Sequence, residues 1–355
     1  MTAPLPVHDA LTVRWGESDG SPLPRSYGDA AAEYHAALEH AAVVDRCDRA
    51  LLRVYGRDPL RILQGMLSND VTAASPGRAV YAALLTPKGR MLADLRVFRR
   101  PDDFLLELPA AALAGVVETF TRSVPPLFAR WEDVSETLHV LGVYGPEAGA
   151  RLGTLLGTPP PDPALEDAAA AAAIAGQPAI VVSTRFTGGA GYDVVAPTAV
   201  AERLWLELAS TGVRPAGHAP LDVLRIEAGV PCWGAELTTE TIPLEAGIQA
   251  RAISMTKGCY TGQEVIVRIL HRGHVNWLLR GVLLGEAAGA KRDTPLLQPG
   301  TGKQVGRITS SAWSPRLDQE IALAYVRREL EPGAMLELAA TGGPAAQVVT
   351  LPFAA

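Results

Sequence analysis

The sequence has little cysteine, no long apolar run and no excess of positive charge. Its three cysteines, Cys47, Cys232 and Cys259, are too few and too widely spaced for a disulfide framework, and no cysteine–histidine cluster predicts a metal site. The longest apolar run, residues 168–175, is far shorter than the ~20 residues that span a bilayer. The formal net charge of −6 gives no support for nucleic-acid binding. We therefore expect a cytoplasmic protein without a metal, membrane or nucleic-acid partner.

The length of 355 residues is enough for two or three domains with a sizeable core. Apolar periodicity, caps and turn residues predict helices over residues 29–44, 58–67, 111–127, 147–156, 199–209 and 220–227. They predict strands over residues 51–55, 80–85, 91–98, 104–108, 138–144, 180–184 and 192–196. From residue 276 glycine and proline separate short apolar runs, which predicts strands over 277–284, 304–310, 321–326 and 335–339.

The octapeptide KGCYTGQE at residues 257–264 combines a thiol, a cation and a helix-start pattern. Thr261 and Glu264 have the spacing of a capping box, which predicts a helix with Thr261 at its N-cap. Cys259 would then lie near the positive end of that helix, and Lys257 adds a further positive charge. These conditions lower the pKa of a thiol and make it reactive. From spacing alone, a small buried cysteine with a structural role is an equally good interpretation.

Two carboxylates in predicted elements bear on the function, and one of them conflicts with its surroundings. Glu227 falls in the last turn of the predicted helix 220–227, where the helix macrodipole disfavours a carboxylate by ~0.3–1 kcal/mol. Because departures from local preference often mark function, Glu227 is a candidate binding residue; an exposed helix end is the alternative. Asp94 lies in the predicted strand 91–98, and its position alone indicates a polar residue on an open strand face.

The octapeptide resembles the signature of the folate-binding YgfZ family, a branch of the superfamily that contains the glycine-cleavage T-protein, an aminomethyltransferase. Further resemblances run from about Tyr27 to Arg328. The segment RIEAG at 225–229 resembles a superfamily motif whose glutamate binds the pterin ring of folate. The segment GYD at 191–193 resembles a hairpin that usually carries glutamate where this chain has Asp193. The pair Ala93-Asp94 stands where the superfamily has two adjacent aspartates.

The resemblance implies an α+β fold, with discontinuous N-terminal folate-binding subdomains around a central cavity and a C-terminal antiparallel β-barrel. Two interleaved subdomains would occupy residues 1–275, and the barrel would occupy 276–355. The implied ligand is tetrahydrofolate or a derivative, and Glu227 and Cys259 should lie on one cavity. The implied site residues are Glu227, Tyr192 and Arg225 for binding, and Cys259, Lys257 and Asp94 for catalysis. We also expect a monomer.

Two functions compete on this basis. The first is a tetrahydrofolate-binding accessory protein, similar to those that support assembly or repair of iron–sulfur enzymes, with iron–sulfur client proteins as partners. The second is an aminomethyltransferase that passes a one-carbon unit from a carrier-bound amine to tetrahydrofolate. The Cys259 motif favours the first function, and Ala93 in place of an aspartate weakens the second. A scaffold without chemistry is a third alternative, so whether the chain is an enzyme is left open.

Overall fold

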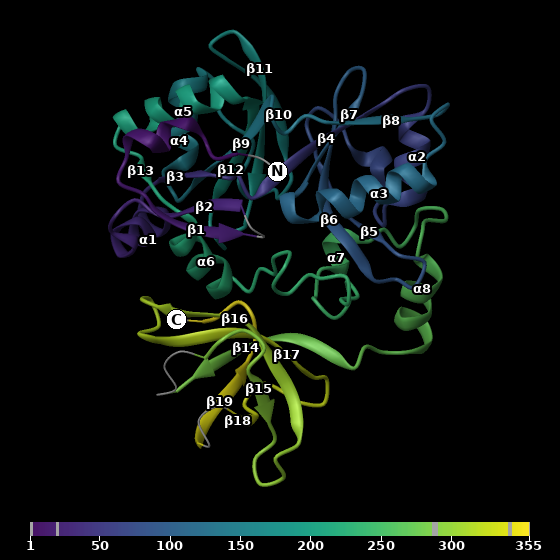
Figure 1. Ribbon diagram of the computed structural model, residues 1–355, viewed down its shortest axis with the longest axis vertical. Helices are drawn as coiled ribbons and strands as arrows, with labels where there is room; N and C mark the ends of the chain where they lie inside the picture. Colours follow the sequence, from purple (N-terminus) through teal and green to yellow (C-terminus); the bar gives the residue numbers. More distant parts are fainter. Residues whose placement is uncertain (1–2, 19–20, 286–289, 340–342, 355) are drawn as a thin grey trace.

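Two sheet-based lobes lie side by side above a β-barrel in the computed structural model, which describes residues 3–18, 21–285, 290–339 and 343–354 (Figure 1). The fold is mixed α and β with a closed six-stranded antiparallel C-terminal barrel, as the resemblance implied. Within the described ranges, no helix is long and apolar enough to cross a membrane.

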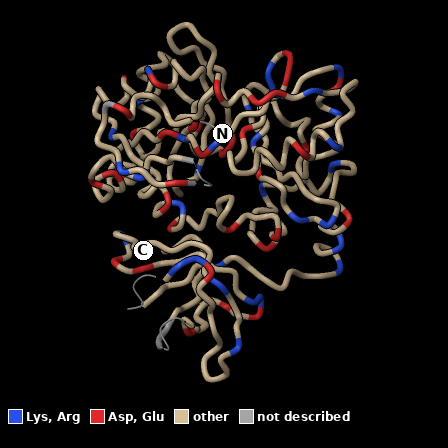
Figure 2. Tube along the Cα trace, in the orientation of Figure 1, with Lys and Arg blue, Asp and Glu red and all other residues tan. Residues whose placement is uncertain are grey.

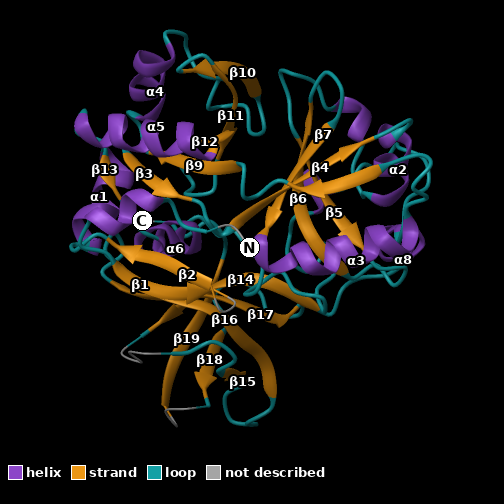
Figure 3. Ribbon diagram, turned by 45° about the horizontal axis from the view of Figure 1, so that its top comes forward, coloured by secondary structure: helices purple, strands orange, loops and turns teal. Residues whose placement is uncertain are grey.

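The first lobe is an antiparallel sheet with helices on its outer face (Figure 3). Its strand order is β5-β6-β7-β4-β8, with bounds β4 Arg49–Tyr55, β5 Val80–Leu85, β6 Met91–Arg99, β7 Phe104–Pro109 and β8 Arg130–Asp133. Helices α2 (Pro59–Met66) and α3 (Leu113–Ser123) bury Leu63, Val116 and Phe120 against the sheet. Asp58 caps α2 as predicted, because its side chain accepts a hydrogen bond from the Arg61 N–H and Pro59 occupies the first turn.

The second lobe is a six-stranded sheet in the order β10-β11-β12-β9-β3-β13. Its strands are β3 Ala42–Asp45, β9 Leu138–Tyr144, β10 Ala169–Ile174, β11 Gln177–Thr184, β12 Gly191–Pro197 and β13 Arg214–Pro215. Its helices are α1 Ala30–Glu39, α4 Ala148–Leu156, α5 Thr198–Ser210 and α6 His218–Glu227. The predicted helix 29–44 is therefore too long, because Val43 and Val44 are buried in β3, which pairs with β9. The alanine-rich β10 was not predicted as a strand.

The barrel has the strand order β14-β17-β16-β15-β18-β19. Its bounds are β14 Trp277–Leu284, β15 Pro295–Leu297, β16 Gln304–Ser314, β17 Gln319–Arg327, β18 Met335–Leu338 and β19 Gly343–Val349. The sequence predicted four of these strands and missed β15 and β19, which are short or rich in alanine and glycine. The remaining strands and α-helices of the described residues are the hairpin β1 (Arg14–Ser18) and β2 (Ser21–Ser26), and helices α7 (Gln249–Ala252) and α8 (Gln263–Arg272).

Successive side chains of a strand point to opposite faces of the sheet, so each sheet has one face in an apolar core and one face outside it. In β6, Ala93 is packed in the apolar core of the first lobe, whereas Asp94 belongs to the opposite face. In β12, Tyr192 lies in the core of the second lobe, whereas Asp193 belongs to the opposite face. The inner faces of the two sheets therefore present charged side chains to the same space.

Candidate functional site

A cavity of about 680 Å³ lies between the two lobes and α6, in the size range of small-molecule sites. Its walls come from the ends and inner faces of β4 to β7, from β12 and the turn before it, from α6 and the loop that follows it, and from α7. In Figure 2, acidic and basic positions lie close together where the lobes meet. Two of the expected site residues, Asp94 and Arg225, line this cavity.

Asp94 is a buried carboxyl group with spare hydrogen-bonding capacity. Its Oδ2 accepts a hydrogen bond from the Tyr81 hydroxyl at 3.2 Å, and its Oδ1 has no hydrogen-bond partner. Burial raises the pKa of Asp94 above its ordinary value; the charge of Arg49 opposes this and that of Glu107 adds to it. Because Ala93 is fully buried under α2 and α3, an aspartate at that position would face the apolar core rather than the cavity. Ala93 therefore does not remove the cavity carboxylate.

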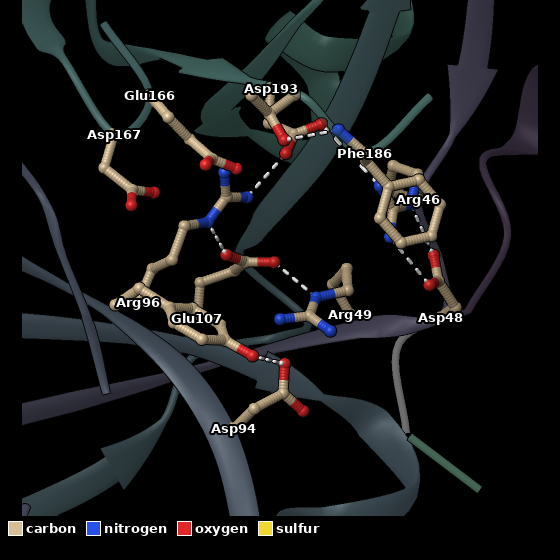
Figure 4. A network of polar contacts seen from close by, with 12 residues as sticks. Arg46, Asp48, Arg49, Asp94, Arg96, Glu107, Glu166, Asp167, Phe186 and Asp193 are labelled. Carbon is tan, nitrogen blue, oxygen red and sulfur yellow. Dashed lines mark hydrogen bonds and ion pairs between the residues drawn. The ribbon is translucent and has the colours of Figure 1, made fainter. Parts of the chain in front are cut away.

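A chain of ion pairs lies beside Asp94 in the cavity wall (Figure 4). The Glu107 carboxylate accepts hydrogen bonds from the Nε atoms of both Arg49 and Arg96. Although burial opposes ionisation, these two guanidinium groups lower the pKa of Glu107 to about 2. The two arginines are thus neutralised in part and held rigidly in the cavity wall.

Asp193 continues this chain on the second lobe. It accepts hydrogen bonds from Arg96 Nη2 at 2.5 Å and from the Tyr144 hydroxyl at 2.7 Å. Arg46, whose guanidinium is paired with Asp48 at 2.8 and 3.0 Å, donates to Tyr144 and lies 3.8 Å from Asp193. Asp193 is therefore a fixed carboxylate of the cavity wall, held by donors from both lobes.

Arg225 lines the cavity but directs its guanidinium toward the barrel. Nη1 donates to the fully buried Glu236 at 2.9 Å, and Nη2 donates to the Ser310 hydroxyl of β16 at 2.7 Å. Nε lies 3.4 Å from the Asp222 carboxylate. Arg225 thus joins the cavity wall to the C-terminal barrel.

Glu227 does not reach the cavity, although it was expected to hold a pterin there. It is 2% exposed and absent from the lining that the described residues form. Both of its oxygens accept hydrogen bonds from the Tyr34 hydroxyl, at 2.9 and 3.0 Å, and Oε1 also accepts one from Ser314 at 2.5 Å. Arg316 lies 3.6 Å away. These donors offset the unfavourable helix-end position, so the local anomaly has a structural explanation.

Tyr192 and Cys259 also lie apart from the described part of the cavity lining. Tyr192 packs in the core of the second lobe, on the face opposite Asp193. Cys259 is exposed in the turn before α8. The predicted capping box is wrong: the N-cap of α8 is Gly262, with φ +84°, and no side chain caps the helix. A Cβ at position 262 would approach the Thr86 carbonyl oxygen to 2.6 Å, so glycine is required there.

Lys257 is bound to the C-terminal end of α2 rather than to Cys259. Its Nζ donates to the carbonyl oxygens of Gln64, Leu67 and Asn69 at 2.7, 2.7 and 2.8 Å. Burial lowers the pKa of Lys257 to about 8, and Asp70 opposes this shift. Three acceptors match the three N–H groups of an ammonium, so the contact fits the protonated side chain.

Several charged residues of the cavity were not predicted as site residues, namely Arg46, Arg49, Arg96, Glu107, Asp193 and Arg251. A signal for some of them was present. Asp94 and Arg96 alternate with apolar residues in β6, and Glu107 interrupts the apolar run of β7. Charges at alternate positions of otherwise buried strands indicate a polar inner face.

Comparison with known proteins shows the class to which the fold and cavity belong. Residues 5–257 match the GCVT N-terminal domain, and residues 279–354 match the glycine cleavage T-protein C-terminal barrel domain. The chain therefore belongs to the glycine cleavage T-protein family. It is 32% identical to an aminomethyltransferase of Rubrobacter xylanophilus, over 98% of this chain and 92% of that protein.

Other similar proteins have the same name. An aminomethyltransferase of Saccharopolyspora erythraea is 31% identical, over 98% of this chain and 96% of that protein. The crystal structure of the glycine cleavage system aminomethyltransferase T from Bartonella henselae has the same fold, with a TM-score of 0.86 at 23% identity over 98% of this chain and 96% of that one. These findings support the T-protein superfamily; they do not single out the YgfZ branch or an iron–sulfur role.

Proposed function

We propose that this chain is an aminomethyltransferase that passes a one-carbon unit from a carrier-bound amine to tetrahydrofolate. The observation that carries the proposal is Asp94. Among the described residues, its Oδ1 is the one buried carboxylate oxygen without a hydrogen-bond partner, and it belongs to a residue of the cavity wall. Similar proteins named aminomethyltransferase, matched over nearly the whole chain, support the same activity.

The residues of the cavity fit a folate. The cavity of about 680 Å³ is large enough for a ligand of that class. Asp193 offers a fixed carboxylate that can accept parallel N–H bonds from the amino-pyrimidinone edge of a pterin. We therefore assign pterin binding to Asp193 in place of Glu227, because Asp193 lines the cavity and Glu227 is absent from its described lining. The Asp193 oxygens already accept hydrogen bonds from Tyr144 and Arg96, so a pterin would use the remaining lone pairs of the carboxylate.

The proposed reaction is a group transfer without oxidation or reduction. A protonated aminomethyl thioether on a dihydrolipoyl carrier and tetrahydrofolate give the free carrier thiol, ammonium and N5,N10-methylenetetrahydrofolate. The carbon–sulfur and carbon–nitrogen bonds of the aminomethyl group break, and two bonds form from that carbon to folate nitrogens. The two hydrogens displaced from folate leave on the thiol and on the ammonium, so atoms and charge balance.

Asp94 is the residue that would move protons in this reaction. The raised pKa brings the carboxyl group closer to the pH at which it exchanges a proton with an amine, and Oδ1 has no hydrogen-bond partner within the protein. Tyr81 holds the other oxygen and fixes the orientation of the carboxyl group. A positioned acid–base group of this kind contributes roughly 10²–10⁴-fold to a rate.

The test is product formation by the wild-type chain. The protein is mixed with a lipoylated carrier loaded with a ¹³C-labelled aminomethyl group and with tetrahydrofolate. We expect ¹³C-methylenetetrahydrofolate and ammonia in equal amounts. Ammonia release that is no faster than in a reaction without the protein would overturn the proposal.

One observation favours the accessory function as a second candidate. Cys259 is an exposed thiol in an octapeptide that resembles the YgfZ signature. In that role it would meet a client protein from outside the cavity. Substitution of Cys259 by alanine would then impair an iron–sulfur enzyme in cells that depend on this chain, while folate binding in the cavity would be unchanged.

A further inference from the structure

Asn69 connects the backbones of two cavity residues that are far apart in sequence. Its Nδ2 donates to the carbonyl oxygen of Tyr81 in β5 and to that of Arg251 in α7, both at 2.8 Å. Its Oδ1 accepts a hydrogen bond from the Asp70 N–H at 2.9 Å, which fixes the orientation of the amide. Asn69 thus sets how close α7 lies to β5.

The side chains of the two connected residues meet inside the cavity. The Arg251 guanidinium carbon lies 4.1 Å from the centroid of the Tyr81 ring. Asp167 holds this guanidinium with two hydrogen bonds, of 3.0 and 2.8 Å, and Glu166 pairs with it at 3.0 Å. The ring of Tyr81 is thereby packed against a cation that is itself fixed by the second lobe.

Tyr81 transmits this arrangement to Asp94. Its hydroxyl is the one side-chain donor to Asp94 in the described part of the chain, at 3.2 Å from Oδ2. Burial raises the pKa of Tyr81 well above its ordinary value, and Asp94 adds to the shift, so the phenol keeps its proton and acts as the donor. The position of the ring therefore decides which carboxylate oxygen is held and which is available.

We propose that Asn69 and Arg251 are positioning residues for Asp94: they fix the Tyr81 ring so that its hydroxyl holds Oδ2 and leaves Oδ1 for the reacting amine. This inference rests on the proposed function, because it deepens the role given there to Asp94. Lys257 extends the arrangement to the octapeptide, since its ammonium binds the Asn69 carbonyl oxygen at 2.8 Å. The lysine of that motif thus acts on the cavity through Asn69.

The titration of Asp94 reports this positioning without any turnover. The titratable or charged groups that face Asp94 are Tyr81 on β5, Arg49 on β4, Glu107 on β7 and Cys232 after α6. Loss of the Tyr81 hydrogen bond removes an interaction that favours the ionised carboxylate, so the midpoint should move to higher pH.

The experiment follows the ¹³C-carboxyl signal of Asp94 in the folate-free protein, assigned with Asp94→Asn, in wild type, Tyr81→Phe, Asn69→Ala and Arg251→Lys. We expect Tyr81→Phe and Asn69→Ala to raise the midpoint, with no further rise in the double variant. Arg251→Lys keeps the positive charge and should shift the midpoint less than Asn69→Ala. Asn276→Ala, an asparagine at the start of the barrel, is the matched control and should leave the titration unchanged.

Measurements of turnover distinguish a positioning role of Asn69 from a purely structural one. Asn69→Ala should lower kcat roughly ten- to a hundredfold with little change in KM, because a misplaced acid–base group affects the transition state. A variant that melts at lower temperature but keeps the wild-type Asp94 titration would overturn the positioning role. If the wild-type protein transfers no aminomethyl group, the proposed function is wrong. The positioning inference is refuted separately, if the titration midpoint of Asp94 is unchanged in both Tyr81→Phe and Asn69→Ala.

Discussion

Asp94 and Glu227 are both buried carboxylates, but their oxygens are bonded differently. Glu227 is sealed at the end of α6, where Tyr34 and Ser314 donate to it. Asp94 lies in the cavity wall with one donor, Tyr81, and one oxygen without a partner. The first arrangement satisfies a charge and stabilises the fold, whereas the second leaves capacity for a substrate. Burial alone therefore does not distinguish Asp94 from Glu227, whereas the unused hydrogen-bonding capacity of Asp94 does.

The largest expected effect on stability concerns Glu227. Glu227→Ala leaves the buried hydroxyls of Tyr34 and Ser314 without their acceptor, so we expect a loss of roughly 3 kcal/mol in the free energy of unfolding. Urea unfolding measures it. Glu227→Gln keeps the shape and should lose less. If Glu227→Ala were as stable as wild type, the claim that Glu227 stabilises the fold would be contradicted.

The next effect concerns folate affinity. Asp193→Ala removes the proposed pterin carboxylate, and the loss of a charge-assisted hydrogen bond should weaken 5-formyltetrahydrofolate binding about ten- to a hundredfold. Glu227→Gln is the control and should bind as wild type does. Isothermal calorimetry gives both constants. The assignment would be reversed if Glu227→Gln lost affinity and Asp193→Ala kept it.

A smaller effect should appear in thiol labelling. Burial, with the charges of Asp45 and Asp48, raises the pKa of Cys47, and burial raises that of Cys232 to about 12, whereas Cys259 is exposed. We expect iodoacetamide at neutral pH to label Cys259 more than tenfold faster than the other two cysteines, because each unit by which burial raises the pKa of Cys47 or Cys232 lowers its thiolate content about tenfold. Peptide mass spectrometry resolves the sites. Faster labelling of Cys47 in the folded protein would contradict this order.

The smallest effect is a gain in stability at Asp94. Because burial raises its folded-state pKa above the unfolded value, the native state holds the proton more tightly, and stability contributed by this group falls as pH rises above ~4. Near pH 7 the free energy of unfolding of Asp94→Asn should therefore be about 1 kcal/mol higher than that of wild type. Below pH ~4 this advantage should disappear, because the wild-type carboxyl group is then protonated in both states. Urea unfolding of wild type and Asp94→Asn at pH 7 and below pH ~4 measures the difference. If Asp94→Asn were less stable than wild type at pH 7, the claim that the buried, ionised Asp94 carboxylate destabilises the native state would be contradicted.

The sequence was sufficient for much of the fold and for part of the site. The helix at Pro59 and strands such as Leu138–Tyr144 have local caps or apolar runs that survive in the structure. Asp94 and Arg225, which were predicted as site residues, line the cavity, and their roles stay predictions. The direction of Glu227 was not predictable, because its partners Tyr34 and Ser314 are 193 and 87 residues away. The capping box failed because the positive φ of Gly262 starts α8 one residue later.

The central claim is that chemistry occurs in the cavity at Asp94 rather than at the exposed thiol of Cys259. The most direct test compares aminomethyl transfer to tetrahydrofolate by wild type, Asp94→Asn and Cys259→Ala in one assay with a loaded lipoyl carrier. The account predicts that Asp94→Asn loses roughly 10²–10⁴-fold in rate and that Cys259→Ala transfers as wild type does. Loss of transfer in Cys259→Ala together with full activity in Asp94→Asn would contradict it.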